Sequence, residues 1–314
     1  MDGDDSLRRV EDLWFSNDTL VLRAENRIFR VSKAMLAARS SVFETMFEFP
    51  PPASDGDEIM DGSPVVTLHD FAAEVEVFLR AIFNSSYFMP PPSPTDAEVA
   101  LGILRLSHKY GVDYLHKRAI THLETLYNPD RTIYRTLSSN GQPHHAQTLA
   151  FHLQALPVLI EVGAMWLVPL AYYAVGTYDI SQLRSAGPPW DSLPTGIRET
   201  CLPLAGIQRH AIADISRFLS DICDAANPAY ALAQLFLVSS VITRRPTLPY
   251  GAQDPLAEWN DGEWAAVEDL CGDCFSSFKA EQAQAFNEVW DALPLNCGLE
   301  SWDVLLQRRK AVMG

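Results

Sequence analysis

"IFRVSKAMLAARSSVFETMF", residues Ile28–Phe47, is the stretch that decides the fold of the N-terminal part of the chain. Its first residues are β-branched and aromatic, which is typical of a strand. Ser32 can cap a short helix that follows, and Ser41 with Glu44 has the S-x-x-E spacing of a capping box. The stretch therefore predicts one strand followed by two short helices.

The residues before this stretch complete a hairpin. Thr19–Arg23 and Arg27–Val31 are β-rich runs joined at Glu25 and Asn26, which favours two antiparallel strands with a tight turn. A third strand is expected at Val65–Leu68, after the loop "FPPPASDGDEIMDGSP", whose Pro, Asp and Gly content is incompatible with regular structure. The sequence thus predicts a three-stranded sheet.

Three longer helices are expected after the sheet. In each, apolar residues recur at helical spacing and form one stripe. Thr95 and Glu98 form a second capping box, and Gly111 suits the residue that ends a helix. The residues expected to face the core are Val75, Phe78, Leu79, Ile82, Val99, Ile103, Leu106, Tyr110, Leu115, Ala119, Leu123 and Leu126. Strands with interspersed helical hairpins indicate a compact α+β domain.

The chain divides at "YNPDRT", residues Tyr127–Thr132. Beyond this point no strand pattern stands out, and helical patterns cover residues 148–162, 211–223, 230–242 and 276–293. We therefore expect an α+β domain over residues 1–128, with its core at 18–127, and a mostly α-helical C-terminal region over residues 129–314.

Composition excludes several classes of function. The formal net charge of -16 argues against binding to nucleic acids or anionic membranes, because both attract mainly Lys and Arg. The acidic N-terminus lacks the apolar region of a secretory signal, and five scattered cysteines fit a reducing compartment. We expect a soluble intracellular protein of the cytoplasm, the nucleus or both.

One apolar segment, Leu156–Gly176, has roughly the 20 residues that a membrane-spanning helix needs. It also contains Glu161, Gly163 and two prolines, and no Lys or Arg lies close to either end. A carboxylate in a spanning helix is costly. We therefore expect two short buried helices, broken near Pro169, and no membrane partner.

Residues 18–127 resemble a BTB/POZ domain. The resemblance is carried by "VLRAENRIFRVSKAMLAARSSVFETMF", "PVVTLHD", "VEVFLRAIFNSSYF" and "LGILRLSHKYGVDYLHKRAITHL", which have the order and spacing of the family's segments. It implies an α+β BTB/POZ fold and a non-catalytic interaction module, acting as a scaffold or adaptor that binds other proteins or itself. The sequence contains no G-x-S-x-G, H-E-x-x-H or nucleotide-binding fingerprint, so nothing in it makes a positive case for an enzyme.

The second half is similar to the C-terminal region of a large group of uncharacterised fungal BTB proteins. The similar segments are "GAMWLVPLAYY" at residues 163–173 and "VWDALPLNCGLESWDVLL" at residues 289–306. This resemblance implies no activity. The aromatic residues Trp166, Trp290 and Trp302 are expected to pack in the core rather than to anchor a partner.

The resemblance also indicates candidate binding residues. In dimeric BTB proteins a basic residue after the hairpin pairs with an Asp before the first strand; Lys33 keeps the basic residue, and the Asp position falls on Thr19, beside Asp18. Adaptors for cullin ubiquitin-ligase scaffolds often carry a hydrophobic-x-Glu motif soon after "MF", which this chain lacks. A role as a cullin substrate receptor stays an alternative. The candidate partner-binding residues are Lys33, Asp18, Phe43, Met46 and Phe47.

The cysteines suggest a third hypothesis, a zinc-binding or redox protein. Cys271 and Cys274 have the C-x-x-C spacing, but a tetrahedral zinc site needs two further ligands, and the remaining candidates, Cys223 and Cys297, are isolated. Glu268, Asp269 and Asp273 would raise the pKa of nearby thiols and so oppose redox catalysis. We therefore expect no metal and no cofactor, and two small apolar side chains on one helix face instead.

Overall fold

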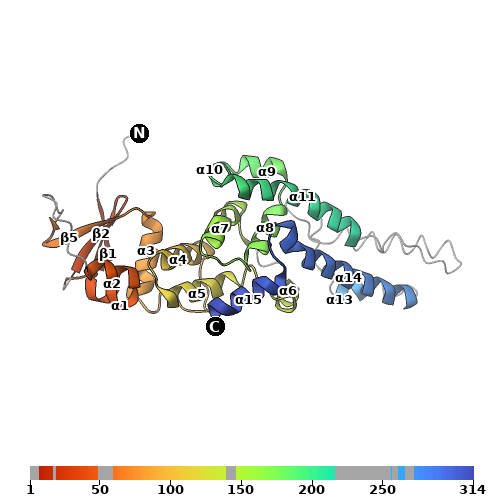
Figure 1. Cartoon of the computed structure of the whole chain (residues 1–314), viewed down its shortest axis with the longest axis horizontal. Helices are drawn as coiled ribbons and strands as arrows, with labels where there is room; N and C mark the ends of the chain where they lie inside the picture. The colour runs from red at the N-terminus through yellow and green to blue at the C-terminus, as the bar shows by residue number, and fades with distance from the viewer. Residues whose placement is uncertain are drawn as a thin grey trace. The chain divides into compact units, whose positions relative to one another are not determined.

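The computed structural model describes residues 7–16, 19–48, 59–138, 146–215, 256, 261–265 and 272–314. The chain consists of two compact units, Met1–Leu123 and Glu124–Gly314. The first combines a sheet with helices, and the second is helical in its described part (Figure 1). The predicted combination of an α+β domain and a helical C-terminal region is confirmed.

The first unit contains a five-stranded sheet in the order β1-β3-β2-β5-β4. The central pair, β2 and β3, is the predicted antiparallel hairpin, with Glu25 in the left-handed region at a φ of 48°. β5 pairs with β2 in parallel, and β1 pairs with β3 in parallel. The strands are β1 (Arg8–Trp14), β2 (Thr19–Ala24), β3 (Arg27–Ser32), β4 (Ile59–Met60) and β5 (Ser63–Leu68).

Two of these strands, β1 and β4, were not predicted, so the sheet is larger than the expected three strands. β1 has the sequence RRVEDLW, in which the buried apolar residues Val10 and Leu13 are three positions apart. A strand signal needs alternation with a period of two, and β1 instead shifts register against β3 between Arg9 and Trp14. β4 is only two residues long, which is too short for any sequence pattern.

The five helices of this unit are α1 (Lys33–Arg39), α2 (Ser41–Glu48), α3 (Ala72–Phe83), α4 (Ala97–Lys109) and α5 (Asp113–Leu123). The Ser32 hydroxyl accepts a hydrogen bond from the Met35 backbone N–H at 3.4 Å, which confirms the predicted cap of α1. The capping box predicted for α2 is wrong by one residue. The Ser40 hydroxyl, not that of Ser41, accepts from the Phe43 N–H at 3.1 Å, and it also donates to the Tyr110 carbonyl at 2.5 Å.

The capping box predicted at Thr95 is also wrong, because Asp96 occupies the N-cap of α4 and its side chain makes no capping hydrogen bond. The predicted helix end at Gly111 is confirmed by its φ of +63°. A side chain at this position would meet the Ser41 hydroxyl, so glycine is required for two reasons, its backbone conformation and the close approach of α2.

Most of the predicted stripe residues form the core of the unit, with Val75, Phe78, Leu79, Ile82, Ile103, Leu106, Leu115, Ala119 and Leu123 buried. Val99 and Leu126, which were also predicted to face the core, are only half-buried. Tyr110 lies at the centre of an aromatic stack. Its ring centroid is 4.8 Å from that of Phe43 and 5.7 Å from that of Phe78. Phe43, from the stretch that predicted the fold, therefore packs against Tyr110 at the end of α4, and Tyr110 in turn packs against Phe78 of α3.

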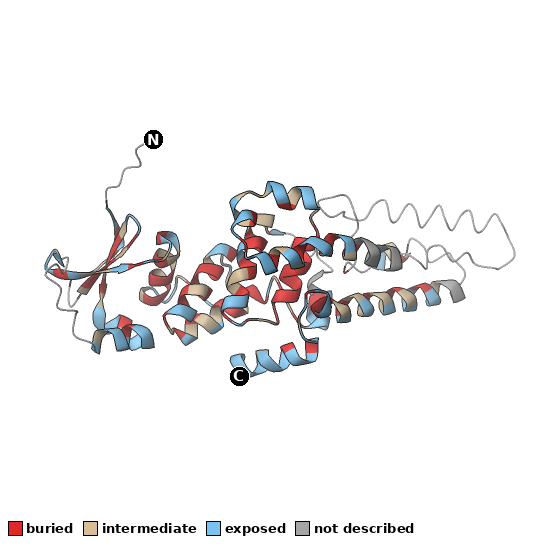
Figure 2. Cartoon of the chain, turned by 45° about the horizontal axis from the view of Figure 1, so that its top comes forward, coloured by how far each residue is buried: buried red, intermediate tan, exposed pale blue. Residues whose placement is uncertain are grey.

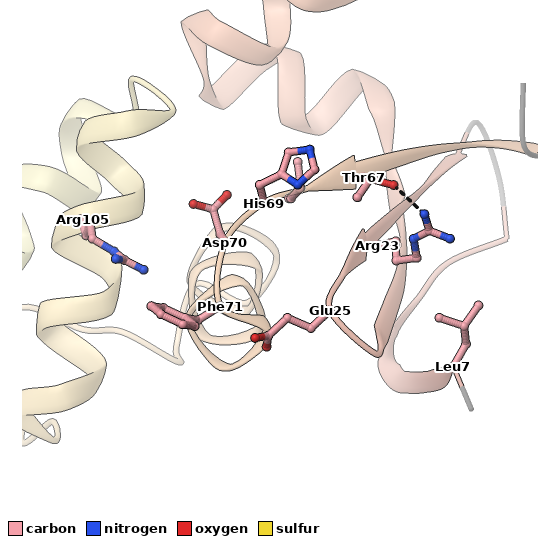
Figure 3. A pocket seen from close by; sticks show the side chains of 9 residues that line it. Leu7, Arg23, Glu25, Thr67, His69, Asp70, Phe71 and Arg105 are labelled. Carbon is pink, nitrogen blue, oxygen red and sulfur yellow. Dashed lines mark hydrogen bonds between the residues drawn. The ribbon is translucent and has the colours of Figure 1, made fainter. Parts of the chain in front are cut away.

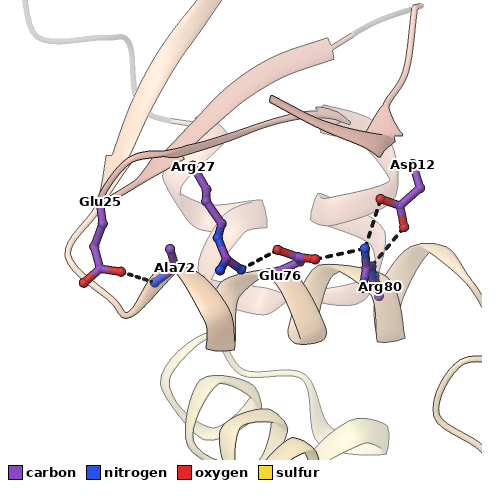
Figure 4. Close-up of polar contacts among 6 residues, drawn as sticks. All are labelled: Asp12, Glu25, Arg27, Ala72, Glu76 and Arg80. Carbon is purple, nitrogen blue, oxygen red and sulfur yellow. Dashed lines mark hydrogen bonds and ion pairs between the residues drawn. The ribbon is translucent and has the colours of Figure 1, made fainter. Parts of the chain in front are cut away.

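Four side chains of alternating charge, Arg27, Glu76, Arg80 and Asp12, connect the edge of the sheet to α3 (Figure 4). Glu76 on α3 pairs with Arg27 on β3 at 2.5 Å and with Arg80 at 2.9 Å. Arg80 in turn makes two hydrogen bonds with Asp12 on β1, at 2.9 and 3.1 Å. This row of side chains therefore connects both β1, through Asp12, and β3, through Arg27, to α3.

The helices of the second unit are α6 (Arg131–Ser138), α7 (Leu149–Glu161), α8 (Val168–Gly176), α9 (Ile180–Ser185), α10 (Pro188–Asp191), α11 (Thr195–Ile215), α13 (Asp261–Ala265), α14 (Gly272–Asn296) and α15 (Trp302–Met313). The helices predicted at 148–162 and 276–293 are confirmed as α7 and as part of α14. The helix predicted at 211–223 is described only as far as Ile215, and the one predicted at 230–242 lies outside the described residues.

The apolar segment Leu156–Gly176 forms two helices, as predicted, within α7 and α8. The break falls between them at Gly163, with a φ of +74°, and Pro169 lies in the first turn of α8 rather than at the break. None of the helices in the described ranges combines the length and the apolar character needed to cross a membrane.

Buried residues line the inner faces of these helices (Figure 2). Trp166, Trp290 and Trp302 are all buried, which confirms their predicted place in the core. The Trp302 indole N–H donates to the Trp290 carbonyl at 2.7 Å, and the two rings stack 5.1 Å apart. This contact fixes the start of α15 against the end of α14.

Candidate functional site

The α1–α2 hairpin presents an apolar surface to solvent. We call Lys33, Met35, Val42, Met46 and Phe47 the α1–α2 face. Three of its large apolar side chains are exposed to a substantial extent, Met35 and Val42 by 42% and Met46 by 36%. Methionine side chains are flexible and polarisable, so they adapt to differently shaped partners. The face therefore has the character of a protein-contact surface.

Helix geometry explains why these residues point outward. Phe43 is buried in the aromatic stack, and the Ser40 hydroxyl donates to the backbone carbonyl of Tyr110 at the end of α4. One side of α2 therefore faces the core. Val42 and Met46 are four residues apart and lie together on another side of the helix. Of the predicted partner-binding residues, Met46 is thus exposed, Phe47 is half-buried, and Phe43 belongs to the core.

Lys33 is exposed at the start of α1, with its ammonium 4.9 Å from the centre of the Phe47 ring. The structure brings these two predicted residues together as a cation–π pair. Asp18, the other member of the predicted charged pair, lies outside the described residues. Within the described ranges Lys33 forms no ion pair, and Thr19 instead accepts a hydrogen bond from the Arg30 guanidinium at 2.9 Å.

A groove of about 720 Å³ lies where β2 and β5 end and α3 begins (Figure 3). Phe71 is 60% exposed there, with the Arg105 guanidinium 5.2 Å from the centre of its ring. Arg105 also pairs with Glu74 on α3. Across the groove, the Arg23 guanidinium donates to the Thr67 hydroxyl at 3.1 Å. The groove combines an exposed aromatic ring with charged groups that are held in place by internal contacts.

The acidic wall of the groove is built from Asp70. Its carboxylate accepts hydrogen bonds from the Tyr110 hydroxyl at 2.5 Å and from the Lys109 ammonium at 2.6 Å. Burial, followed by the hydrogen bond to Asp70, raises the pKa of Tyr110 far above its ordinary value. Tyr110 therefore stays a donor at all physiological pH values and fixes the orientation of the carboxylate.

Sequence reasoning did not find this groove or the exposure of Met35 and Val42. Phe71 directly precedes the apolar pattern of α3, so a sequence signal would place it in the core. The exposure of Val42 and Met46 could have been predicted from the sequence. Apolar residues four positions apart share one side of a helix, and when another side of that helix faces the core, they indicate an apolar surface.

The cysteine candidates are only partly covered by the described residues. Cys223 and Cys271 lie outside them, and Cys274 lies in α14 with its side chain outside the description. Cys297 is buried, and burial raises the pKa of its thiol to about 12. Burial has the same effect on Cys201. Among the described side chains no three His, Cys, Asp or Glu residues are grouped so that they could hold a metal ion.

The model of the BTB/POZ domain family matches residues 11–126. No significant match was found among curated proteins, and none among solved structures. The matched range begins inside β1 and ends just beyond α5, so it covers most of the sheet, the α1–α2 hairpin and the residues that line the groove except Leu7. The resemblance of residues 18–127 to a BTB/POZ domain is confirmed, and the chain contains a BTB/POZ domain over residues 11–126.

Proposed function

We propose that the chain is a non-catalytic scaffold or adaptor that binds other proteins through the α1–α2 face of its BTB/POZ domain. BTB/POZ domains are in general protein-interaction modules. The observation that supports this particular surface is the exposure of Met35, Val42 and Met46 on adjoining short helices. Burial of such side chains against a partner contributes roughly 25 cal/mol per Å² of apolar surface.

One partner is a second copy of the chain. The experiment is sedimentation velocity over a range of concentrations, with Met46→Glu compared with Val304→Glu, a substitution on α15 at a residue of similar exposure. We expect association that weakens by at least tenfold in Met46→Glu and is unchanged in Val304→Glu. A monomeric mass at every concentration would rule out self-association.

A different protein is the other kind of partner. Affinity purification with mass spectrometry, using the unmodified chain and Met46→Glu side by side, identifies proteins whose recovery depends on this face. A partner recovered equally well with both chains binds elsewhere. If no protein depends on Met46 and the chain is monomeric, the α1–α2 face has no role in binding.

A cullin is the second candidate partner, because the exposed residues Val42 and Met46 lie on the helix where cullin adaptors are expected to make contact. A pull-down with a purified cullin tests this directly. We expect binding that is reduced by Val42→Glu; undetectable binding of the unmodified chain would eliminate a substrate-receptor role.

We infer an intracellular location from the thiols. Cys201 and Cys297 are free and buried, as is common for cysteines of reducing compartments. Fractionation of cells that express the tagged chain would test this inference; recovery from the medium would contradict it.

A further inference from the structure

Two arginines and a tyrosine lie together where α1 ends and α5 begins. We call Arg39, Tyr114 and Arg118 the Arg–Tyr–Arg cluster. The Arg39 guanidinium lies 5.5 Å from the centre of the Tyr114 ring, and the Arg118 guanidinium lies 5.8 Å from it. Arg39 is the last residue of α1, and Tyr114 and Arg118 are four positions apart on one side of α5. The fold therefore brings two cations to one ring.

Most hydrogen-bond donors of the cluster are unused. Stacking on a ring occupies the flat face of a guanidinium and leaves the N–H groups at its edge available. In the part of the chain that the structure describes, Arg118 donates only to the Phe88 carbonyl, at 2.5 Å. Within the same residues neither Arg39 nor the Tyr114 hydroxyl has a hydrogen-bond partner. Arg39 is exposed, and none of the unused donors belongs to the buried polar atoms, so a ligand can reach them from solvent.

The cluster is also not neutralised, although the chain is acidic. Asp and Glu outnumber Lys and Arg by 40 to 24, yet within the described ranges no carboxylate pairs with Arg39 or Arg118. Burial raises the pKa of the Tyr114 hydroxyl, and the charges of both guanidinium groups oppose this rise, so both lie near the hydroxyl as well as near the ring. Two cations and one neutral O–H donor are thus neighbours at the surface.

We propose that the Arg–Tyr–Arg cluster binds the phosphate group of a phosphorylated segment of a partner protein. A phosphate monoester carries about 1.5–2 negative charges at pH 7 and has three strong acceptor oxygens, which suits two guanidinium groups and one hydroxyl. Clusters of arginine recur where proteins recognise phosphorylated peptides. The net charge of -16 repels nucleic acids and anionic membranes, which carry many phosphates, and a peptide with a single phosphate is therefore the favoured ligand.

This inference goes beyond the proposed function of the α1–α2 face. The cluster shares no residue with that face, and phosphate binding needs no partner there. Met46→Glu leaves both guanidinium groups in place, and substitutions in the cluster leave Met35, Val42 and Met46 in place. The two proposals can therefore fail separately.

The test uses the full chain and a short capped alanine peptide with phosphoserine, glutamate or serine at its centre. Binding is measured by isothermal titration calorimetry, with saturation-transfer NMR to detect weak binding. We expect the phosphoserine peptide to bind at least about tenfold more tightly than the serine peptide, because charge-assisted hydrogen bonds are the strong ones, and the glutamate peptide to bind with intermediate affinity. Arg39→Gln should weaken binding of the phosphoserine peptide by at least about tenfold, and Tyr114→Phe should weaken it by a few-fold.

Arg184→Gln is the matched control, because Arg184 on α9 is exposed and its loss removes the same charge away from the cluster. It should bind the phosphoserine peptide like the unmodified chain. Arg39→Lys keeps the charge but lacks the planar fork, so it should restore only part of the affinity lost in Arg39→Gln.

The proposal is overturned if the phosphoserine and serine peptides bind equally or if neither binds. It is also overturned if Arg39→Gln and Arg184→Gln weaken binding alike, which would reveal only a general effect of charge. Inorganic phosphate that binds as tightly as the phosphoserine peptide would overturn it as well, because the cluster would then be a site for the free ion. Circular dichroism checks that each variant is folded, and Tyr114→Phe decides the matter if Arg39→Gln is not.

Discussion

Arg309→Met should release the C-terminal helix from the helical unit. Arg309 on α15 makes two hydrogen bonds with the Glu124 carboxylate, from Nε at 2.6 Å and from Nη2 at 2.8 Å. The Glu124 side chain is only 9% exposed, and it also accepts a hydrogen bond from the Trp166 indole N–H at 3.0 Å. Removal of the guanidinium would leave a buried carboxylate without its counter-charge.

The magnitude follows from the burial of the two partners. Hydrogen bonds to charged groups contribute about 1.5–3 kcal/mol each, and breaking a fully buried ion pair costs about 3–5 kcal/mol. Because the Arg309 side chain is 39% exposed, water can replace part of its contribution. We therefore expect a loss of about 2–3 kcal/mol, which is an increase of about 30- to 150-fold in the population of the opened helix.

Hydrogen exchange measured by mass spectrometry on peptides from α15 is the appropriate assay, because a chain with two units need not unfold in a two-state transition. Arg308→Met is the control. Arg308 pairs with Glu300, and both side chains are about half exposed, so its loss should change exchange by only a few-fold. The double variant Glu124→Gln/Arg309→Met should recover most of the protection, since a neutral amide can still accept from Trp166. Equal exchange in Arg308→Met and Arg309→Met would refute the reasoning.

The remaining predictions concern the cap of α2, one histidine and two thiols. Ser40→Ala removes both the helix cap and the bond to the Tyr110 carbonyl, and should cost about 1–3 kcal/mol of opening free energy in hydrogen exchange of the α2 peptides. An effect below about 0.5 kcal/mol, the usual limit for a surface change, would contradict this. Burial lowers the pKa of His116, so the unfolded state binds its proton more readily. Stability should fall as the pH drops through about 6.5 and below, and His116→Gln should flatten this part of the profile. Cys201 and Cys297, whose pKa burial raises to about 12, should resist iodoacetamide at pH 8 in the folded chain and react in urea, as peptide mapping would show.

The sequence was sufficient to predict the elements that are determined by residues close together along the chain. The hairpin, the cap at Ser32, the stripes of the long helices and the end of α4 at Gly111 each depend on neighbouring residues. The start of α2 could not be chosen in this way, because Ser40 and Ser41 are chemically identical candidates. The Tyr110 carbonyl, 70 residues away, selects Ser40.

The candidate sites were less predictable for the same reason. The groove beside Phe71 is lined in part by Arg105 from α4, whose guanidinium lies over the Phe71 ring, and the bond between Glu124 and Arg309 joins residues 185 positions apart. The resemblance to BTB/POZ domains located the α1–α2 hairpin correctly, but only the packing shows that Phe43 is core and Met46 is surface.

β1 has a practical consequence for anyone who produces the N-terminal domain alone. A recombinant fragment that starts at residue 18, where the recognisable family segments begin, would lack this strand. The outer edge of β3 would then carry unpaired backbone groups, and the sites filled by Val10 and Leu13 would be open to water. Such an edge is a template for sheet formation between molecules. We expect that fragment to precipitate on concentration and a fragment that starts before Leu7 to remain in solution.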